Sequence, residues 1–385
     1  MNLLKRTALL AGSIAAIVGA VLGAAMGLVG VADAAPGGQN ASAIVSVFAK
    51  GLNNPRGLKF GPDGNLYVAE GGVGGATSTA GPPKLCDQVP GVGPYTGSPT
   101  GARISKIDTQ GQRTTFADGF PSSQTAIMGG LISGVADVAF IDGTLYALIA
   151  GAGCSHGLVG TFNGIAKVNS NGSWAMIANL SDFQKANPVK NPNPGDFEPD
   201  GTWYSMVAVR GALYAVEPNH GELDVVTTDG TTSRVVDISA TYGHVVPTAI
   251  AYHGNFYIGN LNTFDPIGPG ASKIYKVTPS GQIKIDTDGV SLVTGVAFDN
   301  RGRMYVLELG TDPSTFTPFT GQIVRIDPSG RQTVIVSNAN APTLFFPTGM
   351  TFGPDGSLYV SNGGFGLPPA LPEGLGTILK IDITD

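Results

Sequence analysis

Hydrophobic residues fall in short runs along most of the chain, and the runs are separated by turns that contain glycine. One unit recurs: an apolar run, a turn, and a second run that is rich in aromatic residues. The clearest copies are residues 55–68 and 347–360, which share a Gly-Pro-Asp-Gly turn followed, one residue later, by Leu-Tyr-Val. Short apolar runs bounded by Gly, Pro and Asp are typical of β-strands joined by tight turns. The pattern therefore predicts a series of β-hairpins.

The repeat occurs six times, and each copy carries a glycine at its turn: Gly64, Gly143, Gly211, Gly254, Gly302 and Gly356. The shortest spacing, from Gly211 to Gly254, is 43 residues, which is close to the length of a four-stranded propeller blade. A second pair of apolar runs, joined at another X-Gly turn, follows in each of the first five copies. The sequence therefore predicts an all-β fold, a six-bladed β-propeller, with inserted loops in the longer copies.

The last copy lacks a fourth strand. Its third strand is predicted at residues 378–381, near the end of the chain, whereas residues 43–49 form an apolar strand before the first copy. We expect this N-terminal strand to complete the last blade, because the pairing removes an open sheet edge. The propeller domain is accordingly expected to span residues 43–385, after a flexible linker at residues 35–42.

Residues 1–34 have the pattern of a secretory signal peptide. Lys5 and Arg6 precede a long uncharged apolar stretch, and the small residues at 32–34 suit cleavage before Ala35. An uncleaved membrane anchor is the alternative, because the stretch is long enough to cross a bilayer. We expect cleavage, and hence a secreted protein, periplasmic or extracellular, with no membrane span in the mature chain.

The chain contains two cysteines, Cys86 and Cys154. An even pair in an exported protein favours a disulfide, and two free thiols are the alternative. Both residues lie in glycine-rich sequence rather than in apolar runs, which favours the disulfide.

Composition and net charge exclude some classes of binding partner. Charged residues make up 13% of the chain, hydrophobic residues 42%, and the net charge is −6. An acidic chain has no electrostatic attraction for nucleic acid or an anionic membrane. We expect a monomer that binds neither.

Long loops are predicted on one face only. In a four-stranded blade, the second strand ends on the face from which the first strand starts, and segments between blades open on the same side. The extra length falls at residues 71–102, 151–164, 181–202, 261–272, 309–321 and 363–376. Function commonly resides on loops held by a rigid scaffold, so we expect this loop-rich face to be the working face.

Polar residues gather where the second strands are predicted to end. The position is a carboxylate or an amide in five of the six copies: Glu70, Glu217, Asn260, Glu308 and Asn362. A ring of such oxygens suits Ca²⁺. The alternative is that each side chain forms hydrogen bonds to the backbone of a neighbouring turn. We favour this interpretation, because Asp, Glu and Asn at strand ends commonly have that role.

Other candidates lie close by. The predicted starts of the first strands carry possible ligand-binding residues: Arg56, Tyr204, Thr248, Thr294 and Thr348. Of the four histidines, His220 and His244 fall near the loop-rich face and are candidate general bases. His156 and His253 are expected to have surface or hydrogen-bonding roles. Neither a Gly-x-Ser-x-Gly nor a His-Glu-x-x-His motif is present.

Nearly all of the chain after the signal segment resembles the ScyD/ScyE family of exported proteins, within the wider group of NHL-like and lactonase-like six-bladed propellers. The resemblance rests on Gly-Leu-Asn-Asn-Pro-Arg-Gly-Leu at residues 51–58, on residues 191–201, and on Pro-Thr-Gly at 347–349 with Gly-Thr-Ile at 376–378. The third copy departs from the family pattern at Glu-Pro-Asn-His, residues 217–220.

Two functions follow as hypotheses. The first is a binding or interaction module that holds a small molecule, glycan or protein on the loop-rich face, with no certain cofactor and calcium as the one candidate. The second, implied by the likeness to propeller lactonases and gluconolactonases, is a calcium-dependent hydrolase, in which Ca²⁺ polarises an ester carbonyl and His220 or His244 acts as the base. We favour the first, because the candidate site consists only of residues that are common at strand ends. A fold resemblance does not fix the chemistry.

Overall fold

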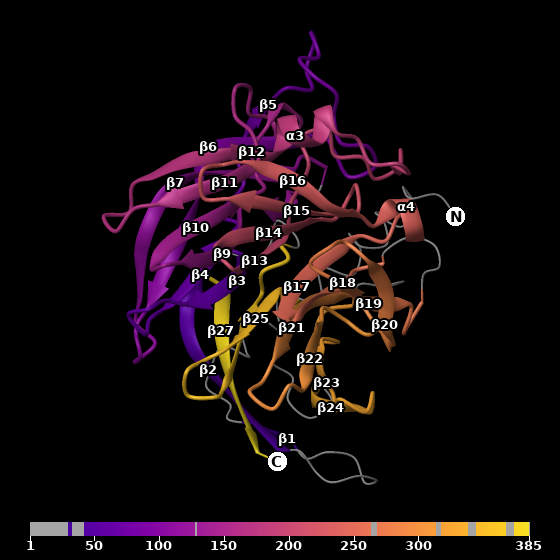
Figure 1. Cartoon of the computed structure of the whole chain (residues 1–385). Helices are drawn as coiled ribbons and strands as arrows, with labels where there is room; N and C mark the ends of the chain where they lie inside the picture. The colour runs from indigo at the N-terminus through magenta and orange to yellow at the C-terminus, as the bar shows by residue number, and fades with distance from the viewer. Residues whose placement is uncertain are drawn as a thin grey trace.

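The computed structural model describes residues 30–32, 42–127, 129–262, 268–312, 317–337, 344–366 and 373–384. These residues form six antiparallel sheets arranged around a central axis (Figure 1). Each sheet runs from an inner to an outer strand in sequence order, apart from the last, so the predicted six-bladed β-propeller is confirmed.

The first three blades follow one another along the chain. Blade 1 contains β3 (Pro55–Phe60), β4 (Leu66–Glu70), β6 (Tyr95–Ile107) and β7 (Arg113–Thr125), extended by β5 (Thr77–Ser78) and β8 (Gly130–Ser133). Blade 2 contains β9 (Val135–Ile141), β10 (Thr144–Ile149), β11 (Gly164–Val168) and β12 (Trp174–Asn179). Blade 3 contains β13 (Ser205–Val209), β14 (Ala212–Glu217), β15 (Glu222–Thr227) and β16 (Thr232–Asp237).

The other three blades complete the ring. Blade 4 contains β17 (Pro247–His253), β18 (Asn255–Asn260), β19 (Ser272–Val277) and β20 (Ile283–Val290). Blade 5 contains β21 (Val293–Phe298), β22 (Met304–Glu308), β23 (Gln322–Ile326) and β24 (Gln332–Ser337). Blade 6 contains β25 (Gly349–Phe352), β26 (Leu358–Asn362), β27 (Gly376–Thr384) and β2 (Ser42–Leu52), with β1 (Gly30–Ala32) outside β2. Short helices lie between strands: η1 (Cys154–His156), α3 (Leu180–Ala186) and α4 (Ser239–Tyr242).

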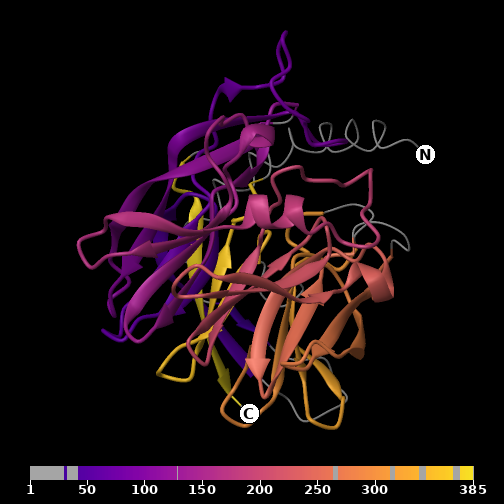
Figure 2. The same cartoon turned by 45° about the horizontal axis from the view of Figure 1, so that its top comes forward.

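The N-terminal strand closes the ring as the sequence predicts. β2 pairs antiparallel with β27 over most of its length, with Val45 opposite Ile381 and Lys50 opposite Thr377. The two strands lie side by side in both views, β2 in indigo and β27 in yellow (Figures 1 and 2). The closing strand is longer than predicted, because the apolar alternation continues beyond Ala49 to the buried Leu52.

Glycine sets the turns between the inner strands. The six turn glycines named above all have positive φ, between 72° and 81°. This left-handed conformation is strained for residues with a Cβ atom and is readily adopted by glycine. The repeat is therefore visible in the sequence because the backbone demands glycine at the same point of every blade.

The hydrophobic core lies between adjacent blades. Ile104 and Phe120 of blade 1 pack against Val138 of blade 2, for example, and Leu307 of blade 5 packs with Val360 of blade 6. Each blade is therefore stabilised mainly by its two neighbours, and the closed ring leaves no blade with an uncovered face.

One predicted loop is partly strand. Residues 71–102 were expected to be a loop, yet they contain β5 and the first part of β6. This part of β6 pairs with the end of β7, Tyr95 lying opposite Thr125. The Gly and Pro residues here obscure the strand pattern in the sequence. Glycine is needed at position 97, because a Cβ atom there would lie 2.5 Å from the carbonyl oxygen of His156 in η1.

The expectations for the N-terminus fall largely outside the described residues. The predicted signal peptide at 1–34 and the predicted linker at 35–42 lie outside the described residues, apart from residues 30–32 and 42. Within the described part of the chain, no helix is long and apolar enough to cross a membrane.

Candidate functional site

Three of the predicted ligand-binding residues connect neighbouring blades. The hydroxyl of Thr294 donates to the carbonyl of Pro347 (2.9 Å), and that of Thr348 donates to the carbonyl of Pro55 (2.6 Å). Thr248 makes the same kind of bond to the Val293 carbonyl. All three threonines are buried. Their hydroxyls thus link blade 4 to blade 5, blade 5 to blade 6, and blade 6 to blade 1.

The other two, Arg56 and Tyr204, contact each other. The guanidinium of Arg56 lies over the Tyr204 ring, 5.3 Å from its centroid, and donates to the carbonyl of Ile132 at 2.6 Å. The Tyr204 hydroxyl reaches the Thr348 carbonyl at 3.4 Å. Blades 3 and 6 are opposite each other in a six-membered ring, so this contact crosses the channel. Burial raises the pKa of the Tyr204 phenol, which therefore stays neutral.

Asp137, on the inner strand β9, was not singled out from the sequence. Its buried carboxylate accepts hydrogen bonds from the Met206 amide (2.7 Å) and the Ser205 hydroxyl (3.0 Å), and so joins blade 2 to blade 3. Burial raises the pKa of Asp137 to about 6 despite these donors. The one sequence signal was an acid within an otherwise apolar inner strand.

The strand-end carboxylates of blades 1 and 3 bind the backbone that leads into their own blade. Glu70 accepts from the Asn53 amide (2.5 Å) and forms an ion pair with Arg103 (2.9 Å). Glu217 accepts from the Thr202 amide (2.9 Å) and the His220 amide (2.6 Å). Both side chains are fully buried, and burial raises the pKa of Glu217.

The other three strand ends repeat this arrangement. The Asn260 amide donates to the Val245 carbonyl at 2.7 Å, Glu308 accepts from the Ser291 amide at 3.0 Å, and Asn362 accepts from the Phe345 amide at 2.8 Å. Burial raises the pKa of Glu308 to about 7. These contacts occupy the five side chains with the backbone of their own blades.

No group of three or more His, Cys, Asp or Glu side chains in the described part of the chain is placed to hold a metal ion. The oxygens that Ca²⁺ would need are those that bind backbone amides. Calcium at the strand ends therefore stays a prediction. The contacts found there are hydrogen bonds to the backbone segment that precedes the first strand of each blade.

The predicted disulfide is confirmed. Cys86 and Cys154 are bonded, with their Cα atoms 6.2 Å apart. The bond ties the loop after β4 to η1 in blade 2, and the Thr79 hydroxyl supports it by donating to the Cys154 carbonyl at 2.6 Å. The loops of two blades are thus fixed to each other on the loop-rich face.

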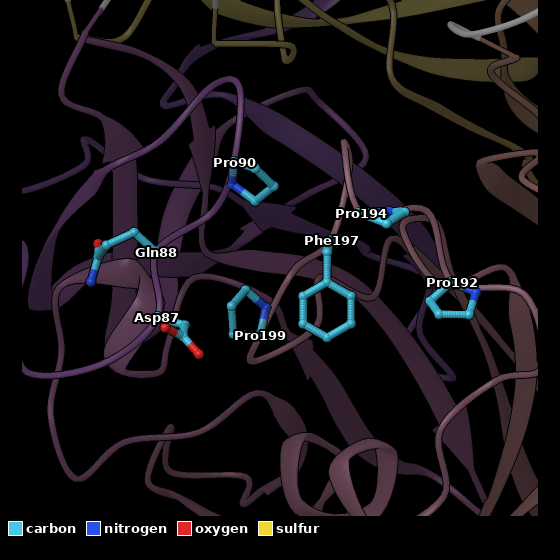
Figure 3. A pocket seen from close by; sticks show the side chains of 7 residues that line it. All are labelled: Asp87, Gln88, Pro90, Pro192, Pro194, Phe197 and Pro199. Carbon is cyan, nitrogen blue, oxygen red and sulfur yellow. The ribbon is translucent and has the colours of Figure 1, made fainter.

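An open groove of about 320 Å³ lies where these loops meet the segment that joins blades 2 and 3 (Figure 3). We call it the loop-face groove. It is lined by Asp87, Gln88, Pro90, Pro192, Pro194, Phe197 and Pro199. Figure 3 shows the Phe197 ring between Pro199 and Pro192. Phe197 is 38% exposed, and it is the one aromatic residue of the lining.

Histidines hold the segment that carries Phe197. His244 Nε2 lies 2.8 Å from Asp196 Oδ2, and His220 Nε2 lies 3.0 Å from the Glu198 carbonyl. The His220 ring also packs against the Phe197 ring, with centroids 4.7 Å apart. The two candidate bases thus lie on the loop-rich face, as predicted, and both contact the segment that forms the groove.

The Glu198 side chain turns inward, away from the groove. Its Oε2 lies 3.4 Å from His156 Nε2, and His156 Nδ1 lies 2.8 Å from the Ser123 hydroxyl. The Tyr95 ring packs on His156, and burial together with the Glu198 charge holds the pKa of Tyr95 well above its usual range. His156 has the predicted hydrogen-bonding role, but in the interior rather than at the surface.

Ser123, His156 and Glu198 have the residue types of a nucleophile, a base and an orienting acid. Their burial argues against that use: Ser123 and His156 are 0% exposed and Glu198 is 4% exposed. A hydroxyl that no substrate reaches cannot attack one. The three side chains instead connect β7, η1 and the segment that carries Phe197.

Known proteins share the fold. No protein-family model matches the sequence, and no curated protein matches it. A protein of unknown function from Bacteroides thetaiotaomicron matches with a TM-score of 0.55 at 12% identity, over 92% of this chain and 84% of that one. A putative glucose dehydrogenase from Thermus thermophilus gives 0.53 at 16% identity, over 88% and 99%.

A gluconolactonase from Xanthomonas campestris gives a TM-score of 0.52 at 10% identity, over 93% of this chain and 98% of that one. The chain is thus a propeller with gluconolactonase-like structural neighbours. Identities this low establish the fold alone, and none of these matches confirms the resemblance to the ScyD/ScyE family.

Proposed function

We propose that the protein is a binding module that holds its ligand in the loop-face groove. The observation that carries the proposal is the contrast between the two places where a ligand could sit. At the axis, Arg56 stacks on Tyr204, the Tyr204 hydroxyl reaches the Thr348 carbonyl, and the threonines are engaged in bonds between blades. At the groove, the exposed Phe197 ring and four prolines line an open surface.

The groove is rigid before any ligand arrives. Proline restricts its own backbone, the Cys86–Cys154 bond fixes one wall, and His220 with His244 fixes the other. A preformed surface loses little conformational entropy on binding, which favours affinity. The lining suits a ligand with an apolar ring or side chain that packs on Phe197 and a polar group that reaches the exposed Asp87 carboxylate.

Ligand-observed NMR with a fragment library tests this proposal. We expect a set of fragments with apolar rings to bind the wild-type protein and to lose binding in Phe197→Ala. Ile285→Ala is the matched control, because Ile285 is 40% exposed on the outer strand β20 and its loss should change nothing. Fragments that bind both variants as they bind the wild type would contradict the proposal.

A hydrolase is the second candidate, and one observation favours it. His244 and Asp196 form a pair at 2.8 Å on the loop-rich face, and a carboxylate that orients a histidine is the usual arrangement for a general base. The likeness to a protein named as a gluconolactonase agrees with this hypothesis. A lactone and aryl-ester screen tests it. Hydrolysis that His244→Ala abolishes would establish this function, and rates equal to those in buffer would exclude it for these substrates.

Calcium is tested separately, by the melting temperature in the presence of CaCl₂ and after chelation. A rise in melting temperature with calcium that is lost in Glu308→Gln would assign the ion to the strand ends. Equal melting temperatures in both conditions would show that the five residues act through hydrogen bonds alone.

A further inference from the structure

We infer that the chain has a second binding site, on its outer rim between blades 1 and 2, and that this site takes a neutral saccharide. The site is a groove of about 480 Å³, a volume typical of small-molecule sites. We call it the Trp174 groove. It is lined by Thr115, Phe116, Ala117, Asp118, Asn171, Gly172, Ser173 and Trp174. It lies beside the turn between β11 and β12, toward the face with the short turns, so it is separate from the loop-face groove.

The propeller repeat does not explain the tryptophan. Trp174 is the first residue of the fourth strand of its blade, and the same position holds Arg113, Thr232, Ile283 and Gln332 in blades 1, 3, 4 and 5. A polar or aliphatic residue therefore satisfies the fold. Trp174 packs one face flat on the fully buried Phe120, with centroids 4.5 Å apart and planes 17° apart.

The indole is held in one orientation. Its Nε1–H donates to the Asp118 carbonyl at 3.0 Å, and its covered face lies on Phe120. Trp174 is half-buried and lines the groove, and the stack on Phe120 leaves only its other face and its edge to meet a ligand. A fixed aromatic face pairs well with the apolar C–H face of a sugar ring, because both surfaces are desolvated without losing a hydrogen bond.

Polar groups surround that face. Asp118, Thr115, Asn171 and Ser173 are all exposed. The Asp118 carboxylate has no partner in the described part of the chain. A carboxylate is a strong acceptor for sugar hydroxyls, and hydrogen bonds to a charged group are worth more than neutral ones. An aromatic floor with a free acceptor and hydroxyl or amide groups around it is the chemistry that binds a neutral saccharide, and the negative charge disfavours an acidic one.

Glycine lets the turn beside Trp174 approach blade 1 closely. Gly172 lies against the outer strand of blade 1, where a Cβ atom would come within 2.4 Å of the Phe116 carbonyl oxygen. Gly230 makes the same approach to the Ile177 carbonyl oxygen one blade further on, at 2.0 Å. The close approach of blades is thus a general feature of the fold, whereas the tryptophan and the free carboxylate beside it belong to blades 1 and 2.

Tryptophan fluorescence tests the inference on the full chain. The chain has two tryptophans, and Trp203 is fully buried and bonded to Asp224, so a ligand-dependent change in emission reports on Trp174. The probes are glucose, galactose, mannose, N-acetylglucosamine, maltose and cellobiose, up to high millimolar concentration. We expect a saturable change with at least one of them and weaker binding of glucuronic acid than of glucose. No change with any neutral sugar, or equal binding of glucuronic acid, would overturn the inference.

Variants locate the site. Asp118→Ala keeps the indole as the reporter and should weaken binding by about tenfold or more, because a charged hydrogen bond is lost. Trp174→Thr, measured by calorimetry, should abolish binding, and Ile283→Thr, the corresponding change in blade 4, should leave it unchanged. Wild-type affinity in Asp118→Ala would overturn the inference even if Trp174→Thr fails to fold. Phe197→Ala should bind the sugar normally, which separates this site from the proposed function.

Discussion

At the residue scale, one chemical group can have two roles, and its surroundings decide between them. Glu70, Glu217 and Glu308 have the chemistry of calcium ligands, yet each is buried against backbone amides of its own blade. The sequence could identify these positions, because they recur at the end of the second strand. It could not show which way each side chain turns, since that depends on how the segment 15–17 residues earlier in the chain folds back against the strand end.

Asp137 gives a prediction about pH. Its pKa is about 6 in the folded protein, against an ordinary value of 3.8, so the folded state holds the proton more tightly than the unfolded chain. The stability from this group is fully present below about pH 4 and is lost as the pH rises through 6, by about 3 kcal/mol at most.

Asp137→Asn cannot lose a proton, so its melting temperature should fall less between pH 4 and pH 7 than that of the wild type. Thermal unfolding at a series of pH values measures this difference. Parallel curves for the two proteins would show that Asp137 does not titrate in this range.

At the element scale, the repeat made the strands of the six blades predictable, whereas the structure of the inserted segments could not be predicted. The turn glycines and the spare N-terminal strand were sufficient for six blades and for the closure. The ribbon formed by β6 and β7 was missed, because Gly97 and Pro99 interrupt the strand pattern and the pairing is supported by contacts with η1. The loop-face groove was missed for the same reason: its lining comes from two insertions whose meeting depends on the whole ring.

The closing strand gives a second prediction. Deletion of residues 43–49 removes the outer pairing partner of β27 and the buried residues Ala43, Val45 and Ala49. We expect a large drop in the melting temperature or loss of a cooperative transition, measured by circular dichroism. Deletion of residues 35–41 is the control and should have little effect. An unchanged melting temperature after the first deletion would mean that β2 does not close the ring.

The disulfide gives a third prediction. It closes a loop of 68 residues between Cys86 and Cys154, for which the chain-entropy model gives a stabilisation of about 4 kcal/mol. The double variant Cys86→Ser, Cys154→Ser should melt at a lower temperature and bind groove ligands more weakly, because one wall of the groove is then released. Reduction of the wild type should reproduce both effects, and fragment binding that survives in full would show that the wall is held without the bond.

At the scale of the whole molecule, one set of polar residues bonds the blades to one another and another set lines the surface grooves. The axis and the strand ends serve the ring, whereas the exposed Phe197 and the half-buried Trp174 line two separate grooves. This arrangement refines the expectation of one working face, which rested on loop length alone. Loop length indicates where a surface can vary, but Trp174 stands beside a short turn.

A crystallographic soak with the fragments that bind in solution shows directly whether ligands occupy the loop-face groove or the axis. We expect fragment density in the loop-face groove against Phe197, with the Arg56 and Tyr204 side chains still in contact. Density for a ligand or a metal ion at the axis, with Arg56 and Tyr204 displaced and the groove empty, would contradict it.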